Sequence, residues 1–399
     1  MTQPRISRRQ LMRGAAGVAA TASLASVLAA CGVEGTKGTG AAEDFDWTAW
    51  WAEQKPTDRL VFANWPLYID TAKGKYPSIE KFTRETGIKV AYKPVIQENA
   101  EFFSQISPVL QAGDPIGYDI IVISDGWQLT QLMENRWLTP LDRSRLPNFN
   151  KYAGEVATNL AYDPDLTYNV VWQAGVTGIA YNEDLVDGPI NSIEALFDTK
   201  YKGKVGMMSD NDELGTTGLL ALGIEPVGSS LEDWQKSAEL LTKQRDQGIV
   251  RQYYDSSYIK ALENGDVAVS MAWSGDVFQS QQSGFSNLKF VVPEEGGLLW
   301  SDNCVLPLNA KNPVSALKYL NFVYDPENQA IIENWINYIC PVPAAQPIIR
   351  NQLNNPAVAN SPLVFPDPAT IERLRGYPFV ETAETNKEWT DLFDPIVQS

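Results

Sequence analysis

The chain has 399 residues, of which 44% are apolar, and its formal net charge is −17 at pH 7. This length predicts two domains, and the acidic charge disfavours nucleic acid and favours cationic ligands, although any acidic secreted protein carries such a charge. There is no histidine, which excludes Ser-His or Cys-His nucleophilic catalysis and histidine-ligated zinc, and we expect neither a metal nor a cofactor.

Residues 1–30 are typical of a twin-arginine lipoprotein signal peptide. Ser7-Arg8-Arg9-Gln10-Leu11-Met12 is a twin-arginine pattern, and the small-residue apolar run after it ends in Leu28-Ala29-Ala30-Cys31-Gly32, which resembles a lipobox. We therefore expect cleavage before Cys31 and lipidation of its thiol, which anchors the protein to the outer face of the cytoplasmic membrane or places it in the periplasm. An uncleaved anchor is the alternative, but the run is short and alanine-rich for a spanning helix. The general export route also stays open.

Residues 31–57 are predicted to be a lipidated tether. Their first part is rich in Gly, Ala, Thr and acidic residues, whereas Trp47, Trp50 and Trp51 follow later and indicate a short segment that docks on the body.

Strands and helices alternate after residue 58, which is the signature of an α/β protein. Leu60–Trp65 predicts a strand, Ser78 caps a helix that Gly87 ends, and a second strand follows at Ile88–Tyr92. The later predicted strands are residues 118–123, 178–182, 204–208 and 267–273. The later predicted helices are residues 102–110, 214–222, 231–244, 258–264, 316–324 and 328–335.

The stretch Glu294–Cys304 has the composition of a cation receptor. A predicted strand at Leu288–Pro293 precedes it, a glycine pair breaks that strand, and Trp300 and Asp302 then stand two residues apart. A ring face attracts an ammonium group and a carboxylate pairs with it. The alternative is a β-turn with a core tryptophan and an exposed aspartate.

Several phrases of the sequence resemble the bacterial spermidine/putrescine-binding proteins of ABC importers. The resemblance runs from about residue 58 to about residue 345, and the Trp-x-Asp after a strand is its most specific part. The phrases are Asn64-Trp65, residues 81–90 (KFTRETGIKV), 118–122 (YDIIV), 175–182 (GVTGIAYN), 201–205 (YKGKV) and 300–302 (WSD).

The resemblance implies an α/β, two-lobed periplasmic-binding-protein-like (type II) fold with the ligand cleft between the lobes. We expect residues 58–171 and 300–350 to form lobe 1, and residues 172–299 and 351–399 to form lobe 2. All candidate site residues are expected where a strand ends and a loop begins, which is where open α/β sheets bind ligands.

The resemblance also implies the ligand-binding residues of lobe 1. Trp65 and Tyr68 match an aromatic pair after the first strand, but Pro66 stands where the family usually has Thr or Ser. Ser124 matches a polar contact and Tyr338 a family tyrosine. The family's aromatic residue two positions after Ser124 is Gly126 here, and Trp127 follows it.

Further candidates come from the second half of the chain. Asp210 and Glu213 match an acidic pair at a helix start, although an N-cap and a first-turn acid would look the same. Trp273 and Asp276 resemble the turn of putrescine binders. Trp300 and Asp302 match the Trp-x-Asp motif.

Cys304 and Cys340 are the only cysteines of the expected mature body, and each lies two residues beyond a candidate site residue. We predict that they form a disulfide, since two cysteines in an exported protein more often pair than stay free. Two buried thiols are the alternative.

These features predict a substrate-binding protein, not an enzyme, that captures putrescine or spermidine and delivers it to an ABC importer. The resemblance implies permease and ATPase partners, and we expect a monomer whose lobes close on the ligand. Two alternatives stay open: a binding protein for a sugar or a choline-like cation, and an extracellular glycosidase that uses Glu213 and Asp302.

Overall fold

The computed structural model of the protein describes residues 41–398 except 43, 377 and 379–381. The predicted signal peptide, the lipidation site Cys31 and the first part of the tether lie outside the described residues. None of the helices in the described part of the chain is both long and apolar enough to cross a membrane.

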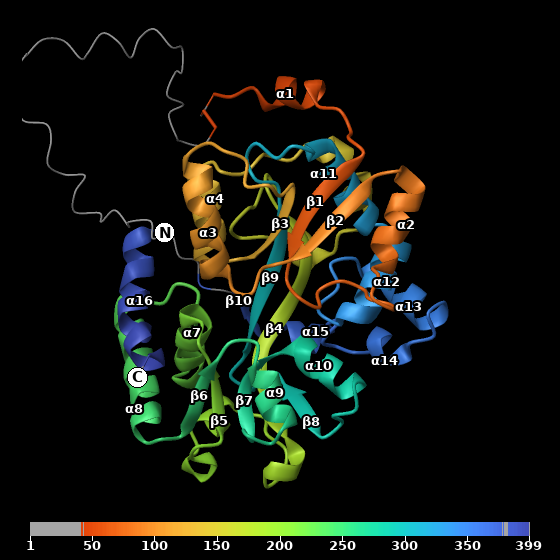
Figure 1. Cartoon of the computed structure of the whole chain (residues 1–399). Helices are drawn as coiled ribbons and strands as arrows, with labels where there is room; N and C mark the ends of the chain where they lie inside the picture. The colour runs from red at the N-terminus through yellow and green to blue at the C-terminus, as the bar shows by residue number, and fades with distance from the viewer. Residues whose placement is uncertain (1–40, 43, 377, 379–381, 399) are drawn as a thin grey trace, which may run out of the picture. The chain divides into compact units, whose positions relative to one another are not determined.

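A mixed sheet runs through the described chain (Figure 1), with the central order β2-β1-β3-β9-β4-β7-β5-β6, while β10 pairs with β9 and β8 pairs with β4. The strands are β1 (Arg59–Asn64), β2 (Lys89–Pro94), β3 (Ile120–Ser124), β4 (Val170–Asn182), β5 (Val205–Met208), β6 (Val250–Tyr254), β7 (Val269–Trp273), β8 (Leu288–Val291), β9 (Gly297–Val305) and β10 (Leu374–Gly376).

Helices cover this sheet. They are α1 (Trp47–Glu53), α2 (Pro77–Thr86), α3 (Asn99–Gln111), α4 (Trp127–Glu134), α5 (Pro147–Tyr152), α6 (Glu155–Thr158), α7 (Asn211–Ala221), α8 (Leu231–Asp246), α9 (Tyr258–Glu263), α10 (Ser274–Gln282), α11 (Pro313–Val323), α12 (Pro326–Ile336), α13 (Gln346–Asn351), α14 (Pro356–Ala359), α15 (Pro368–Ile371) and α16 (Ala383–Val397). Short 3-10 helices lie at Arg143–Arg145, Glu183–Leu185, Ile193–Leu196, Thr199–Tyr201 and Pro343–Ala345.

Two long antiparallel strands, β4 and β9, join two sets of mainly parallel strands. β1 pairs in parallel with β2 and β3 on one side, and β5 pairs in parallel with β6 and β7 on the other. β9 pairs with both β3 and β4, and β4 continues to pair with β7. All 13 residues of β4 are buried, because it lies inside the sheet and is covered on both faces.

Local sequence explains the ends of several helices. Gly87 ends α2 as predicted, in the left-handed region at φ 76°, where a residue without a Cβ is favoured. Ser78, in contrast, is not the N-cap: α2 begins at Pro77, and the buried backbone N–H of Ser78 donates to Asp70 at 2.7 Å. Proline at the first helical position needs no hydrogen-bond acceptor for its missing N–H.

The apolar side chains gather in two large core clusters. The first core cluster includes residues of β1, β3, α2, α11 and α12, and the second includes residues of β5, β7, α7, α8 and α9. A third, smaller core cluster includes residues of α3 and α4. Strand β4 contributes to both large clusters, with Trp172 in the first and Ile179 in the second.

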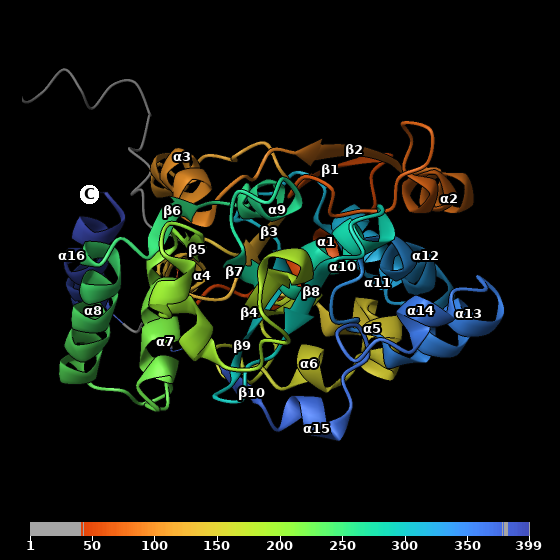
Figure 2. The same ribbon diagram turned by 90° about the horizontal axis from the view of Figure 1, so that it is seen from below.

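The segment after residue 350, which we expected to belong entirely to lobe 2, divides between these clusters. Val358 and Val364 lie in the first core cluster, whereas Trp389 and Phe393 lie in the second. Figure 2 shows α16 beside α8, and the Trp389 ring stacks on Trp234 of α8 at a centroid distance of 3.7 Å. Near the other end of the described chain, α1 docks through the buried Trp51, whose indole N–H donates to the carbonyl of Pro140 at 2.8 Å.

The predicted Cys304–Cys340 disulfide is not formed in the structure. Both cysteines are free and buried in the first core cluster. The Cys340 thiol donates instead to the carbonyl of Val342 at 3.3 Å, and burial raises the pKa of both thiols well above the usual value. Two protonated thiols in a core behave as small apolar side chains.

Candidate functional site

Five aromatic rings form a row in which each ring contacts the next. Tyr68 contacts Tyr338 edge-on at 5.5 Å between ring centroids, and Tyr338 contacts Trp300 at 5.4 Å. Trp300 then meets Trp273 at 6.5 Å, and Trp273 meets Tyr258 at 5.8 Å. We call this set the aromatic row. It brings together rings from the loop after β1, from β9, from the end of β7, from α9 and from the segment after α12.

Trp300 and Asp302 hold their positions because they lie within a strand. We expected both residues where a strand ends and a loop begins, but β9 begins at Gly297 and pairs with β4 from Leu298 to Cys304. The Trp300 ring lies over Gly175 of β4, where an added Cβ would come within 2.3 Å of the ring. The expectation that every candidate follows a strand end is therefore wrong for these two residues.

Asp302 is a buried carboxylate with two hydroxyl donors. Tyr68 donates to its Oδ2 and Ser124 to its Oδ1, both at 2.6 Å. Ser124 and Asp302 are direct neighbours across the β3–β9 pair, so their side chains share one face of the sheet. Burial raises the pKa of Asp302 to about 6, and the two hydroxyl donors oppose that rise.

Asp276 lies in the first turn of α10 and accepts from two phenols. Tyr338 donates to Oδ1 and Tyr258 to Oδ2, each at 2.8 Å. Burial raises the pKa of Asp276, while both phenols lower it. Gly275 allows the Tyr338 ring to lie against the start of α10, since a Cβ there would come within 2.4 Å of the ring.

Glu213, in the first turn of α7, is the third buried carboxylate. Its Oε1 accepts from the indole N–H of Trp273 at 2.9 Å and from the hydroxyl of Thr177. The same hydroxyl accepts from the indole N–H of Trp300 at 3.1 Å, so Thr177 links the ring to the carboxylate. Burial and the neighbouring charge of Asp210 raise the pKa of Glu213 to about 8.

The three carboxylates share one electrostatic property. Their hydrogen-bond donors are all neutral: hydroxyls, phenols and an indole N–H. No lysine or arginine in the described part of the chain forms an ion pair with Asp302, Asp276 or Glu213. A buried carboxylate without a cation is costly, which explains why their pKa values are raised.

The structure therefore places eight of the ten predicted ligand-binding residues on or beside the aromatic row. They are Tyr68, Ser124, Glu213, Trp273, Asp276, Trp300, Asp302 and Tyr338.

Asp210 and Trp65 are placed differently. Asp210 is exposed and caps α7 by accepting from the backbone N–H of Glu213 at 2.9 Å, so it fits the alternative of a helix cap. Trp65 packs against the first and third core clusters, and its buried indole N–H has no hydrogen-bond partner among the described residues.

Sequence reasoning missed four polar residues near these groups. Thr177 and Tyr258 hydrogen-bond directly to the carboxylates, and burial raises the pKa of both Asp125 (to about 8) and Asp212. Thr177 and Tyr258 give no local signal, because a threonine in a strand and a tyrosine in a helix read as ordinary core. Asp125 and Asp212, next to the predicted Ser124 and Glu213, could have been found as acids beside site positions.

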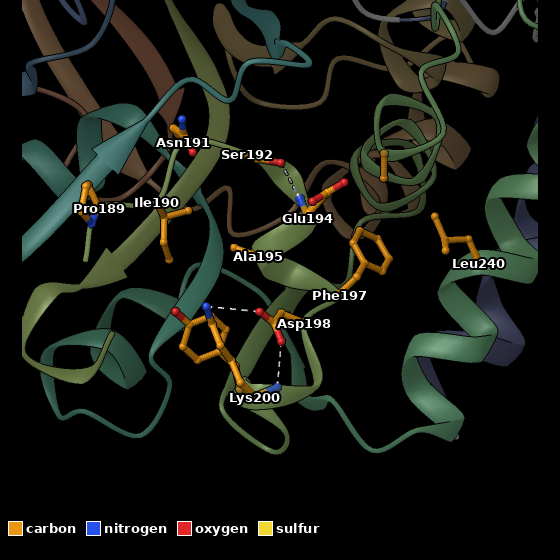
Figure 3. A pocket seen from close by; sticks show the side chains of 12 residues that line it. Pro189, Ile190, Asn191, Ser192, Glu194, Ala195, Phe197, Asp198, Lys200 and Leu240 are labelled. Carbon is orange, nitrogen blue, oxygen red and sulfur yellow. Dashed lines mark hydrogen bonds and ion pairs between the residues drawn. The ribbon is translucent and has the colours of Figure 1, made fainter. Parts of the chain in front are cut away.

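A surface pocket of about 520 Å³ lies apart from this site (Figure 3). It is formed mainly by residues 189–201, and none of the predicted site residues lines it. Two of its polar side chains bond to the local backbone: Ser192 accepts from the N–H of Glu194 at 3.1 Å, and Asp198 from the N–H of Lys200 at 2.9 Å. Asn191 and Ser192 also donate to Glu294 and Glu295. The pocket therefore has no part in the chemistry of the carboxylates.

Two long strands, β4 and β9, join the two halves of the mixed sheet, and aromatic rings and buried carboxylates gather where they meet. This arrangement is typical of a solute-binding protein. The chain belongs to the bacterial extracellular solute-binding protein family, whose model matches residues 78–366. The α/β, two-lobed type II fold predicted from the sequence is thereby confirmed.

Three similar proteins illustrate the relationship. The spermidine/putrescine-binding periplasmic protein of Salmonella typhimurium is 29% identical over 81% of this chain and 87% of its own length. The putrescine-binding periplasmic protein PotF of Escherichia coli is 30% identical over 77% of this chain and 84% of its own. The solved structure of the spermidine/putrescine ABC transporter substrate-binding protein PotD from Streptococcus pneumoniae superposes with a TM-score of 0.72, at 25% identity, over 86% of this chain and 99% of that chain.

Proposed function

We propose that this protein captures a linear di- or polyamine, such as putrescine or spermidine, and delivers it to an ABC importer. The observation that carries the proposal is the set of three buried carboxylates, Asp302, Asp276 and Glu213, which have neutral donors only and lie along five aromatic rings. The names of the relatives, which are putrescine- and spermidine-binding proteins, support the same ligand class.

The chemistry of a polyamine matches each part of this site. Ammonium groups stay protonated at neutral pH, since their pKa resembles the value of about 10 for lysine. A carboxylate can pair with each ammonium, and ring faces can hold both the ammonium groups and the methylene chain between them. A desolvated cation–aromatic contact contributes about 2 kcal/mol and a hydrogen bond between charged groups about 1.5–3 kcal/mol.

The rival ligands fit less well. A sugar could stack on Trp273 and Trp300, but it would leave three buried carboxylates without a positive partner. A choline-like cation would engage the rings and one carboxylate only. For the glycosidase alternative, both oxygens of Asp302 already accept hydrogen bonds from Tyr68 and Ser124, an arrangement suited to holding a cation in place.

The wider setting of the function is proposed with it. Lipidation at Cys31 would hold the exported protein at the membrane. There the protein, as a monomer, would pass the ligand to the permease and ATPase subunits of the importer. The two lobes would close on the ligand, and the segment after residue 350 would contribute to both of them. A dication held by carboxylates of both would favour the closed state by its higher affinity for that state.

Calorimetric titration of the purified protein with putrescine, spermidine, spermine, choline and maltose tests the proposal. We expect binding of at least one linear amine and weaker or no binding of choline and maltose. Saturable binding of maltose with no response to any amine would overturn the proposed ligand class.

A further inference from the structure

Tyr258 holds two parts of the candidate site through one hydroxyl group. The side chain is fully buried in the second core cluster, at the start of α9. Its phenol oxygen lies 2.8 Å from Oδ2 of Asp276 and 2.9 Å from the backbone nitrogen of Trp273. The ring also contacts the Trp273 ring edge-on, at an interplanar angle of 87°.

The direction of these hydrogen bonds follows from the partners. A backbone N–H can only donate, so the Tyr258 oxygen must accept from Trp273. The phenol hydrogen is then free for the carboxylate, and Tyr258 donates to Asp276. The hydroxyl thus fixes the carboxylate of Asp276 relative to the end of β7, from which the Trp273 ring extends.

Asp276 accepts hydrogen bonds from one residue of each large core cluster. Its other oxygen accepts from Tyr338, which belongs to the first core cluster, whereas Tyr258 belongs to the second. Among the described residues, Tyr258 on α9 and Tyr338 after α12 are the titratable groups that face Asp276, and no charged side chain does so. The two phenols are therefore the groups that oppose the effect of burial on this carboxyl group.

We propose that Tyr258 is a positioning residue of the solute site, which holds the Asp276 carboxyl group in place, favours its ionised form and aims it at an ammonium group of the ligand. The inference rests on the proposed function, because it assigns Asp276 a cationic partner. It concerns a residue that would not touch the ligand and that acts through Asp276 and Trp273.

The test uses Tyr258→Phe, which removes the hydroxyl and keeps the ring. Tyr253→Phe is a matched control, because Tyr253 lies in β6, the strand that precedes α9 in the chain, and its buried hydroxyl has no hydrogen-bond partner among the described residues. Carboxyl groups labelled with 13C at aspartate are titrated by NMR in the ligand-free protein, and the Asp276 signal is assigned by its loss in Asp276→Asn.

We expect the titration midpoint of Asp276 to rise by about one pH unit in Tyr258→Phe, since a hydrogen bond to a charged group contributes about 1.5–3 kcal/mol. We also expect the affinity for putrescine to fall about tenfold at pH 7 and further at pH 6, while Tyr253→Phe behaves as the wild type in both measurements. A merely structural role of Tyr258 would lower the melting temperature without moving this midpoint.

This design distinguishes a failure of the inference from a failure of the proposed function. An Asp276 midpoint that is the same in Tyr258→Phe and in the wild type would overturn the inference, whatever ligand the protein binds. A wild type that binds no amine would overturn the proposed function, while the midpoint in the ligand-free protein would still decide whether Tyr258 controls Asp276.

Discussion

Asp302 and Glu213 are both buried carboxyl groups of the candidate site, yet their acidities differ. Each side chain is nearly fully buried, with 6% and 5% of its surface exposed, and each accepts from two neutral side chains. Burial raises the pKa of Asp302 to about 6, whereas burial together with the charges of Asp210 and Asp212 raises the pKa of Glu213 to about 8.

Both carboxyl groups accept from two side chains, so the comparison points to the charges of Asp210 and Asp212, which raise the pKa of Glu213, as a source of the difference. At pH 7 Asp302 is mostly ionised and ready to pair with a cation, whereas Glu213 mostly keeps its proton and must lose it when a cation arrives. Under the proposed function, Asp302 would already be charged when an ammonium group arrives, and Glu213 would become charged as the ligand binds.

The largest effect is expected for Asp302→Asn. The change removes a charge that is already present at neutral pH and sets an amide N–H₂ against Tyr68 or Ser124, both of which donate. We expect the affinity for putrescine to fall roughly a hundredfold, on the basis of about 1.5–3 kcal/mol for a hydrogen bond between charged groups. Titration calorimetry measures the loss, and Glu239→Gln, an exposed acid on α8, serves as the control. Affinity unchanged in Asp302→Asn would remove Asp302 from the site.

A smaller effect, which depends on pH, is expected for Glu213→Gln. In the wild type, affinity should increase as the pH rises from 6 to 8, because the ligand favours the ionised form and Glu213 loses its proton near pH 8. Glu213→Gln should lose about tenfold in affinity at pH 8.5 and much less at pH 6, with a flatter profile between. A wild-type affinity that does not vary with pH would contradict the difference in pKa between Asp302 and Glu213.

The free protein should show the opposite trend in stability. Folded Glu213 keeps its proton up to about pH 8, whereas in the unfolded chain it releases the proton near its ordinary value of 4.5. The folded state therefore binds more protons over this range, so the free energy of unfolding falls as the pH rises, and Glu213→Gln should reduce that fall.

The smallest effect is expected for Asp210→Asn. Asparagine caps helices as well as aspartate does, so α7 should stay intact. Removing the charge lowers the pKa of Glu213, and we expect the pH midpoint of binding to move down by about half a unit while affinity at pH 8.5 changes little. Affinity profiles of the two proteins over the same pH range test this, and coincident profiles would mean that Asp210 does not set the acidity of Glu213.

Much of the fold could be predicted from the sequence because its signals are local. Runs such as Ile120–Ile123 and the stop at Gly87 depend on nearby residues only, and the structure has a strand and a helix end there. The expectation that Trp300 and Asp302 lie between two strands was wrong, because pairing with β4 continues β9 through both residues. Strand pairing between distant segments leaves no trace in a short window.

The candidate site was predicted through resemblance for the residues that carry rings and charges. The roles of Thr177 and Tyr258 could not be predicted, since each depends on a hydroxyl that meets a carboxylate brought in by another element. The prediction of a disulfide was wrong for a related reason. Positions two residues beyond Asp302 and Tyr338 say nothing about where the sulfur atoms of Cys304 and Cys340 point, and Cys340 turns to Val342 instead.

The place of β9 between β3 and β4 has a consequence for the way in which the chain is made. Ile121 pairs with Val305, so β3 must wait for a partner that is synthesised roughly 180 residues later, or about 10–35 s at ribosomal rates of about 5–20 residues per second. During that interval an apolar strand has an open edge, which is the feature that promotes aggregation of nascent chains. We expect a chain that stops before Gly297 to remain unfolded on both sides of the missing strand, and the growing protein to depend on chaperones until that strand emerges.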